Sequence, residues 1–231
     1  MAARGLVNGR GPLRRSGRDL VFPTSPCGLH ASITIYSPIK LDDLKSFRKL
    51  NSNTPGHPEY GKTPGVECTT GLLGQGIGMA VGMAYAERYF NSLVQKYKPK
   101  SKLINYYTYC FCGDGDLMEG VSYEALSFAS THKLNKLILI YDHNSVSLDS
   151  NCDITFTEDI ETRFEALDFN VEHIKGSGNT DKLCEVIESC KKSKKPSIII
   201  VDTVIGKGSR LENTNKVHGN PLSEEDINKI N

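Results

Sequence analysis

From residue 103 onward, apolar runs and amphipathic segments alternate regularly along the chain. The apolar runs predict buried strands at 103–111, 136–141, 169–174 and 197–203. Between them, apolar residues recur at helical spacing, which predicts helices at about 118–132, 157–167 and 180–192. A chain that alternates strands and helices in this way predicts an α/β fold, with a parallel sheet sandwiched between helices.

The preceding part of the chain has a different pattern. Apolar residues at helical spacing predict a short helix at 41–50, and residues 51–74 form a long loop with three prolines and five glycines. A loop of that length is usually functional or disordered. It leads into a helix at about 75–97, in which small residues repeat at Gly76, Gly78, Ala80, Gly82, Ala84 and Ala86. Because glycine destabilises a helix, this smooth face predicts close packing against a neighbouring backbone or a partner subunit.

Residues 1–28 hold five arginines and a single acid, together with many glycines and prolines. This composition predicts an irregular or disordered segment, followed by one folded domain at 29–231. An Arg-rich, acid-poor start is compatible with a transit peptide, but it lacks a clean amphipathic pattern. The sequence is therefore compatible with either a cytoplasmic or an organellar location.

Charge and cysteine content narrow the function classes. The 231 residues carry a formal net charge of +1 with both signs mixed along the chain, which argues against nucleic acid or a membrane surface as partner. No apolar run reaches the roughly 20 residues that a membrane span needs. The seven cysteines are an odd number without a CxxC pair, which favours free thiols in a reducing compartment over disulfides or a cysteine zinc site.

The candidate chemistry begins where the first of the regular strands ends, at Gly113-Asp114-Gly115. Glycines leave backbone amides uncovered, and the start of a helix favours a phosphate. The carboxylate of Asp114 is a ligand that Mg²⁺ or Ca²⁺ accepts. The same residues also fit an ordinary strand–helix turn, with Asp116 as N-cap and Glu119 three residues later. This stretch alone leaves both interpretations open.

Asn144 follows the next predicted strand, thirty positions after Asp114. One strand–helix–strand crossover fits in that interval, so the two strand ends can lie side by side. Ligands bind beyond the carboxyl ends of strands in such sheets. Oxygens from Asp114, Asn144 and a backbone carbonyl would form half of a Mg²⁺ coordination shell, which diphosphate oxygens would complete.

Gly-Asp-Gly followed by Asn at this distance resembles the thiamine diphosphate-binding motif, and the flanking stretches resemble transketolase. Over about residues 41–222 the chain is similar to the N-terminal, diphosphate-binding half of that family, with a weaker similarity at 29–37. The stretches that carry the resemblance are Thr54–Glu59, Thr63–Gly76, Gly113–Gly120, Tyr141–Asn144, Ile205–Ser209 and Val217–Leu222.

The resemblance implies a role for each matched position. Asp114, Asn144 and the carbonyl of Val146 would hold Mg²⁺, for which Ca²⁺ could substitute. The cofactor would be contacted by the Gly115 amide, Asn144 and Leu148, and by Gly71, Leu72 and Leu73 on its aminopyrimidine side. His30, His57 and His218 would be active-site histidines, with His30 and His218 also contacting the cofactor. His132, His143 and His173 are interpreted as structural residues.

The activity implied is transfer of a two-carbon ketol unit from a ketose phosphate to an aldose phosphate, by a whole transketolase or by a split or fragment subunit. The active site would form in a homodimer or with a second chain that carries the pyrimidine-binding half. Two departures are that Gly-Pro-Leu-Gly of the family is Gly71-Leu72-Leu73-Gly74 here, and that an N-terminal histidine region is unmatched. An inactive cofactor-binding remnant or partner subunit is the alternative. Another thiamine enzyme, such as a deoxyxylulose-phosphate synthase or a 2-oxo-acid dehydrogenase subunit, is a third possibility. Thr54–Glu59 and Val217–Leu222 resemble those enzymes less well than they resemble transketolase.

Overall fold

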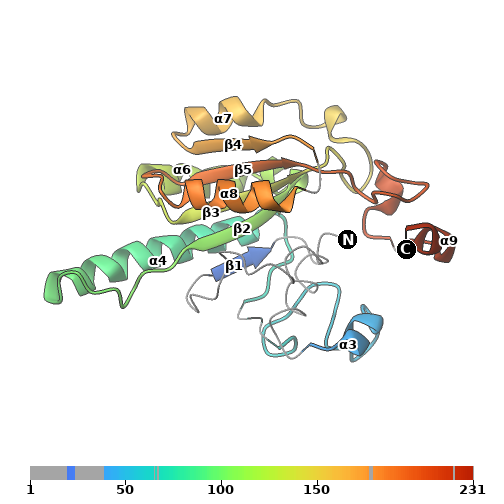
Figure 1. Cartoon of the computed structure of the whole chain (residues 1–231), viewed down its shortest axis with the longest axis horizontal. Helices are drawn as coiled ribbons and strands as arrows, with labels where there is room; N and C mark the ends of the chain where they lie inside the picture. Colours follow the sequence, from blue (N-terminus) through green and yellow to red (C-terminus); the bar gives the residue numbers. More distant parts are fainter. Residues whose placement is uncertain are drawn as a thin grey trace.

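A five-stranded parallel sheet forms the centre of the molecule, with strand order β1-β2-β3-β5-β4 (Figure 1). The strands are β1 (Leu20–Pro23), β2 (Thr108–Gly113), β3 (Leu137–His143), β4 (Asn170–Ile174) and β5 (Ser197–Asp202). This computed structural model describes residues 20–23, 39–64, 66, 68–176, 179–220 and 222–230.

Helices lie on both faces of the sheet, which confirms the predicted α/β class. Those described are α3 (Leu41–Lys45), α4 (Gln75–Tyr97), α5 (Asp114–Met118), α6 (Gly120–Thr131), α7 (Ile160–Ala166), α8 (Thr180–Cys190) and α9 (Glu224–Ile230). Within the described part of the chain, no helix combines the length and the apolar composition that crossing a membrane requires.

The direction of each crossover decides which face its helix covers. From β1 through β2 and β3 to β4 the chain crosses the sheet in one direction, and α4, α6 and α7 pack into one core cluster on one face. From β4 to β5 the chain moves back, and α8 covers the other face, in front of the sheet in Figure 1. Crossovers between parallel strands are right-handed in nearly all proteins. Because the β4–β5 crossover runs across the sheet in the opposite direction to the earlier ones, its helix α8 must lie on the opposite face.

The central strands are buried on both faces, as a parallel sheet between helices requires. Leu139 and Ile198 contribute to the cluster beneath α4, α6 and α7, while Ile138 and Ile199 contribute to the cluster beneath α8. All four side chains are fully buried. The continuous apolar runs of β3 and β5 therefore come from two alternating sets of residues that fill two separate cores.

Some element bounds differ from the sequence prediction. The strand predicted at 103–111 starts at Thr108, because β3 begins at Leu137 and the pairing register starts there. Leu103 is 73% exposed and lies outside the strand. The helix predicted at 41–50 ends at Lys45, since the chain then turns through a left-handed conformation at Arg48 (φ 61°) and leaves Leu50 exposed.

The N-terminal segment was predicted to be irregular over residues 1–28, but four of its residues form the edge strand β1. That strand pairs in parallel with β2, with Leu20 opposite Thr108. The remaining residues of 1–28 lie outside the described residues. A short edge strand of this kind has weak local sequence signals, because its conformation depends on the strand beside it.

The glycines of α4 are not equivalent. Gly74, the N-cap, has φ +76°, and a Cβ there would lie 2.7 Å from Ser122 Oγ and 2.9 Å from Val121 Cγ1. Gly78 and Gly82 have no atom within 4 Å of such a Cβ in the described structure. Close packing within the chain is therefore found where α4 begins and along its buried residues Ala80 and Ala84, whereas Gly78 and Gly82 have no described neighbouring chain against them.

We predict that Gly74→Ala lowers the free energy of unfolding by about 1–3 kcal/mol, because it adds both backbone strain and a steric overlap. Gly78→Ala is the matched control and should leave stability unchanged or raise it by up to about 1 kcal/mol, since alanine favours a helix. Urea unfolding of the two variants measures both. Equal destabilisation by the two substitutions would contradict the packing described at Gly74.

Candidate functional site

The carboxyl ends of β2 and β3 lie next to each other, as the sequence predicted. Gly113, the last residue of β2, pairs with Asp142 in β3. Asp114 therefore comes directly after the end of β2. Asn144 comes directly after His143, the last residue of β3. The segment after β5, which includes the matched stretch at 205–209, leaves the same edge of the sheet toward the side of the molecule where α9 lies (Figure 1).

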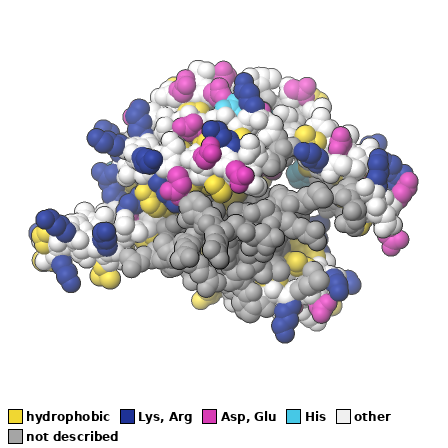
Figure 2. Space-filling model, in the orientation of Figure 1, with side chains coloured by type: hydrophobic (Ala, Val, Ile, Leu, Met, Phe, Trp, Pro, Cys, Tyr) yellow, Lys and Arg dark blue, Asp and Glu magenta, His cyan; other side chains and the backbone are white. Residues whose placement is uncertain are grey.

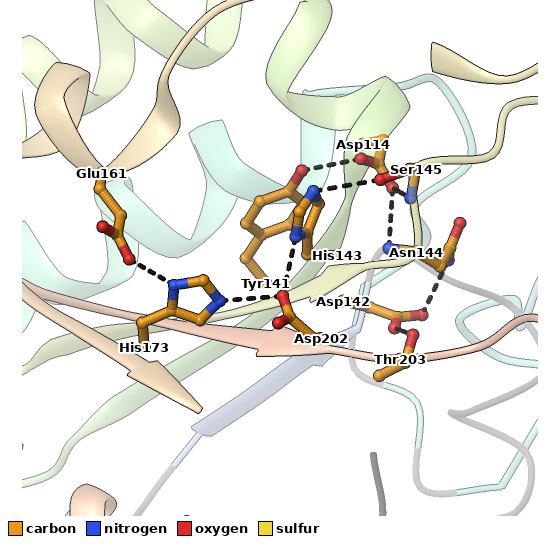
Figure 3. A network of polar contacts seen from close by, with 10 residues as sticks. All are labelled: Asp114, Tyr141, Asp142, His143, Asn144, Ser145, Glu161, His173, Asp202 and Thr203. Atoms are coloured by element: carbon orange, nitrogen blue, oxygen red, sulfur yellow. Dashed lines mark hydrogen bonds and ion pairs between the residues drawn. The ribbon is translucent and has the colours of Figure 1, made fainter. Parts of the chain in front are cut away.

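Asp114 is a buried carboxylate, 4% exposed, with three hydrogen-bond donors around it (Figure 3). The hydroxyl of Tyr141 donates to Oδ1 at 2.8 Å, and the amides of Asn144 and Ser145 donate to Oδ2 at 3.3 and 3.2 Å. Burial raises the pKa of Asp114 above its ordinary value, and these hydrogen bonds offset only part of that rise. A cation beside Asp114 would compensate for the desolvation of its charge.

Asn144 is positioned by a local turn. Its Oδ1 accepts a hydrogen bond from the Val146 amide at 3.0 Å, and its Nδ2 contacts Asp142 Oδ2 at 3.4 Å. An amide oxygen has two lone pairs, so one hydrogen bond leaves Oδ1 able to bind a cation. The bridge between Val146 and Asn151 uses the Ser145 carbonyl and the Ser147 amide, which leaves the Val146 carbonyl out of the pairing. The donor set fits a hard divalent cation.

The turn between β2 and the following helix differs from the ordinary capped helix start that the sequence also allowed. Helix α5 starts directly at Asp114, the chain becomes extended at Glu119, and α6 starts at Gly120. Asp116 is the third residue of α5, not an N-cap, and its Oδ2 accepts from the Gly113 amide at 3.0 Å. Gly113 has an ordinary extended backbone with φ −113°, so no positive φ requires glycine there.

The carboxylate of Asp116 also holds the loop that contains Gly71–Gly74. The Gly74 amide donates to Asp116 Oδ1 at 2.9 Å. This contact sets Leu73 against α5, where a Cβ on Gly115 would lie 3.3 Å from Leu73 Cδ1. A side chain at position 115 would therefore crowd Leu73, whose side chain would have to shift by a few tenths of an ångström. The structure brings together two predicted cofactor contacts, Gly115 and Leu73.

The predicted site histidines lie on two loops. His57 is exposed, and a Cβ on Gly71 would lie 3.9 Å from its Nδ1. His218 is half-buried, and its Nδ1 is buried without a hydrogen-bond partner among the described residues. An orphaned buried nitrogen of this kind is typical of a ligand or water site. His30 lies outside the described residues.

Hydrogen bonds tie the His218 loop to its neighbours. Asn215 Nδ2 donates to the Asp149 carbonyl at 2.8 Å, which places this loop beside the exposed Leu148. Arg48 Nη1 donates to the Gly219 carbonyl at 3.1 Å, which links the loop to the segment after α3. Two predicted contacts, Leu148 and His218, thus belong to connected loops. Among the described residues, no hydrogen bond or ion pair joins His57 to His218.

Sequence reasoning missed the residues that support the site. Tyr141 and Ser145 hold Asp114, and Asp116 joins two segments. Signals for two of them were present. A tyrosine in a buried strand needs a partner for its hydroxyl. An acid three residues after a helix start fits a capping contact, and Asp116 has that spacing from Gly113.

The fold and this site define a class of protein: an α/β domain that offers carboxylate and amide oxygens at adjacent strand ends, as a metal–diphosphate cofactor requires. Sequence comparison gives the family. The family model described as "Transketolase, thiamine diphosphate binding domain" matches residues 29–231. The chain therefore belongs to the transketolase family, which confirms the resemblance in the sequence, and it corresponds to the thiamine diphosphate-binding domain of that family.

Individual relatives agree with this assignment. Transketolase of Aquifex aeolicus is 52% identical over 187 residues, covering 81% of this chain and 27% of that protein. Transketolase of Bacillus subtilis is 46% identical over 207 residues, covering 85% and 31%. The structure of transketolase from Leishmania mexicana matches with a TM-score of 0.87 at 42% identity, covering 92% of this chain and 32% of that one. The chain thus spans about a third or less of each of these relatives.

We predict that Asp116→Ala lowers the free energy of unfolding by about 2–4 kcal/mol, because it leaves the Gly74 and Gly113 amides without their acceptor. The exposed Asp149 provides a matched control, and Asp149→Ala should change stability by no more than about 0.5 kcal/mol. Urea unfolding of both variants gives the comparison. If Asp116→Ala were as mild as the control, the carboxylate would not be the link between these segments.

Proposed function

We propose that this chain binds Mg²⁺ together with the diphosphate of thiamine diphosphate, and that it serves the two-carbon ketol transfer of a transketolase from a ketose phosphate to an aldose phosphate. The observation that carries the metal proposal is Asp114, a buried carboxylate beside Asn144 at the end of two adjacent strands. The family assignment supports the cofactor and the reaction class.

Each residue at the strand ends has a task in this proposal. Asp114, Asn144 Oδ1 and the Val146 carbonyl hold Mg²⁺, and Ca²⁺ could take the same oxygen ligands. The Gly115 amide and Asn144 bind the diphosphate, and Leu148 packs on the thiazolium ring. Bound thiamine diphosphate supplies the electron sink for cleaving the carbon–carbon bond beside a ketose carbonyl.

The loops supply the remaining contacts. Gly71, Leu72 and Leu73 line the aminopyrimidine side, which the contact of Leu73 with Gly115 supports. His57 and His218 hold and move protons at the sugar oxygens, since an imidazole ring can both donate and accept a proton. His30 is proposed to join them on the strength of the sequence resemblance alone. The orphaned Nδ1 of His218 supports a role in contacting a ligand.

We further propose that the site is completed by a second protomer or by a chain that carries the pyrimidine-binding half. Leu72 is 79% exposed, and aromatic side chains of α4 such as Tyr89 and Phe90 are also exposed. Figure 2 shows hydrophobic side chains together with Lys and Arg at the end of the molecule where α4 ends. Free cysteines throughout the described residues support a reducing compartment such as the cytoplasm.

The cofactor proposal predicts stabilisation that depends on both ligands. At thiamine diphosphate about 100-fold above its Kd, with saturating Mg²⁺, the chain should gain about 2.7 kcal/mol against unfolding. Omitting Mg²⁺ should remove the gain, and Ca²⁺ should restore it. Isothermal titration calorimetry and urea unfolding measure Kd and the gain. No stabilisation at any Mg²⁺ concentration would refute the binding proposal.

The matched variant is Asp114→Asn, which keeps the shape of the side chain and removes its charge. We expect the cofactor-dependent gain to be lost. The metal-free variant should be as stable as the unmodified chain or slightly more stable, because burial disfavours the Asp114 charge. His132 packs against Phe128, and His132→Gln is the control. This variant should keep the full cofactor-dependent stabilisation. Loss of the gain in both variants would point to general unfolding instead of a lost metal ligand.

Ketol transfer can be tested by mixing this chain with a chain carrying the pyrimidine-binding half of a transketolase. We expect transfer from a ketose phosphate to an aldose phosphate in the mixture. His218→Ala should lower the rate by about 100-fold or more, since proton transfer by a positioned histidine contributes about that much. The same variant should still bind the cofactor in a Mg²⁺-dependent way, but more weakly, because His218 is also proposed to contact the cofactor. Cofactor binding without any transfer in the mixture would favour a non-catalytic binding protein.

A further inference from the structure

Three neighbouring strands place a metal-binding type of side chain at the same edge and on the same face of the sheet. Each side chain comes two positions after a residue of the core beneath α7: His143 after Tyr141, Asp202 after Ile200, and His173 after Val171. Residues two apart in a strand point to the same face. Because β5 lies between β3 and β4, Asp202 stands between the two histidines.

The three side chains converge on one point (Figure 3). His143 Nδ1 and His173 Nε2 each lie 2.9 Å from the same oxygen of Asp202, Oδ1. The three potential ligand atoms all lie within 4.8 Å of one another. In a tetrahedral zinc site with bonds of about 2.0–2.1 Å, ligand atoms are about 3.3 Å apart. Small side-chain adjustments would therefore place all three around one ion.

The outer nitrogens of both histidines have hydrogen-bond partners: a carboxylate, as is usual for metal-binding histidines, in one case and a serine hydroxyl in the other. Glu161, from α7, contacts His173 Nδ1 through its carboxylate. Ser145 Oγ lies 3.2 Å from His143 Nε2. Hydrogen bonds to the outer nitrogen fix the tautomer and orient the ring, so that the other nitrogen faces the metal. Here they leave His143 Nδ1 and His173 Nε2 facing Asp202.

Without a metal, this arrangement requires extra protons. His173 lies between two carboxylates that only accept hydrogen bonds, so both of its nitrogens must carry hydrogen. A cation at Nε2 would take the place of one of these protons and leave His173 neutral, with its remaining N–H directed at Glu161.

We propose that His143, His173 and Asp202 form a binding site for a divalent transition metal of the Zn²⁺ type, with water as a fourth ligand. Two imidazole nitrogens and one carboxylate oxygen are a ligand set that zinc accepts. The three side chains are partly exposed, so solvent can reach the metal. The ion would join the ends of β3, β5 and β4 in one coordination sphere.

This site differs in chemistry from the one at Asp114. Mg²⁺ prefers oxygen ligands, while imidazole selects zinc and its neighbours in the first transition row. The two sites are also linked, because Ser145 contacts His143 through its hydroxyl and Asp114 through its amide. A metal bound to His143 would hold the turn that supplies two of the amides around Asp114.

The test uses the full chain without a polyhistidine tag, stripped of metal and kept free of thiamine diphosphate and Mg²⁺. Titration with Co²⁺ should produce the visible absorption bands of a tetrahedral site at one equivalent, and Zn²⁺ should remove them. No thiolate-to-cobalt band should appear in the near ultraviolet, since the ligands contain no cysteine. Millimolar Mg²⁺ should leave the cobalt spectrum unchanged.

Variants identify the ligands. His173→Gln and Asp202→Asn should each weaken Co²⁺ binding by more than about 100-fold, and Glu161→Gln should weaken it by about 10- to 100-fold. His132→Gln should bind Co²⁺ as tightly as the unmodified chain does. Thermal unfolding of each metal-free variant shows whether it is folded, and Asp202→Asn tests the site if His173→Gln does not fold.

Three outcomes would overturn the proposal: no tetrahedral cobalt spectrum, cobalt binding that survives both His173→Gln and Asp202→Asn, or a thiolate band showing that cysteines bind the metal. In each case the cluster would be an ion-pair network of two histidines and two carboxylates. The test does not involve the cofactor, so failure of the cofactor proposal leaves this one standing, and the reverse also holds.

Discussion

The buried carboxylate of Asp116 is the contact on which the arrangement of the site depends. One carboxylate oxygen accepts a hydrogen bond from the Gly74 amide, and the other accepts one from the Gly113 amide. The backbone carbonyl of Asp116 accepts a third hydrogen bond from the hydroxyl of Ser122. Four segments are joined in this way: the loop before α4, the end of β2, α5 and the start of α6. A charged acceptor can satisfy two amides at once, and removing it would leave both unsatisfied. Leu73 and Gly115 come together as a consequence.

Asp114, two residues earlier, has a different kind of environment. Its donors are a tyrosine hydroxyl and two rather distant amides, and burial raises its pKa. The domain therefore keeps a charge that is only partly compensated at the point where two strand ends meet. Such a charge destabilises the metal-free state and strengthens cation binding, since the cation relieves the cost. Residues that reduce stability in this way are expected at functional sites.

The sequence predicted four of the five strands, most of the helices and the proximity of Asp114 to Asn144, because hydrophobic periodicity and the alternation of strands and helices along the chain are local signals. It did not predict where β2 begins, since that depends on Leu137 in the partner strand. One of its two interpretations of the turn made Asp116 a helix N-cap, although the side chain binds an amide forty-two positions away. Long-range contacts of this kind have no periodicity. The motif resemblance named the cofactor residues but not Tyr141 and Ser145, which support them.

The cluster of His143, His173 and Asp202 is the clearest example of a long-range arrangement that sequence patterns do not predict. Its members come from β3, β4 and β5, so no spacing along the chain connects them, and each alone is an ordinary residue at a strand end. Only the strand order puts Asp202 between the histidines. A parallel sheet brings all of its carboxyl ends to one edge, so polar residues that end different strands meet there whatever their separation in sequence. The oxygen ligands at β2 and β3 and the imidazoles at β3 and β4 are two results of that geometry, and Ser145 is in contact with both.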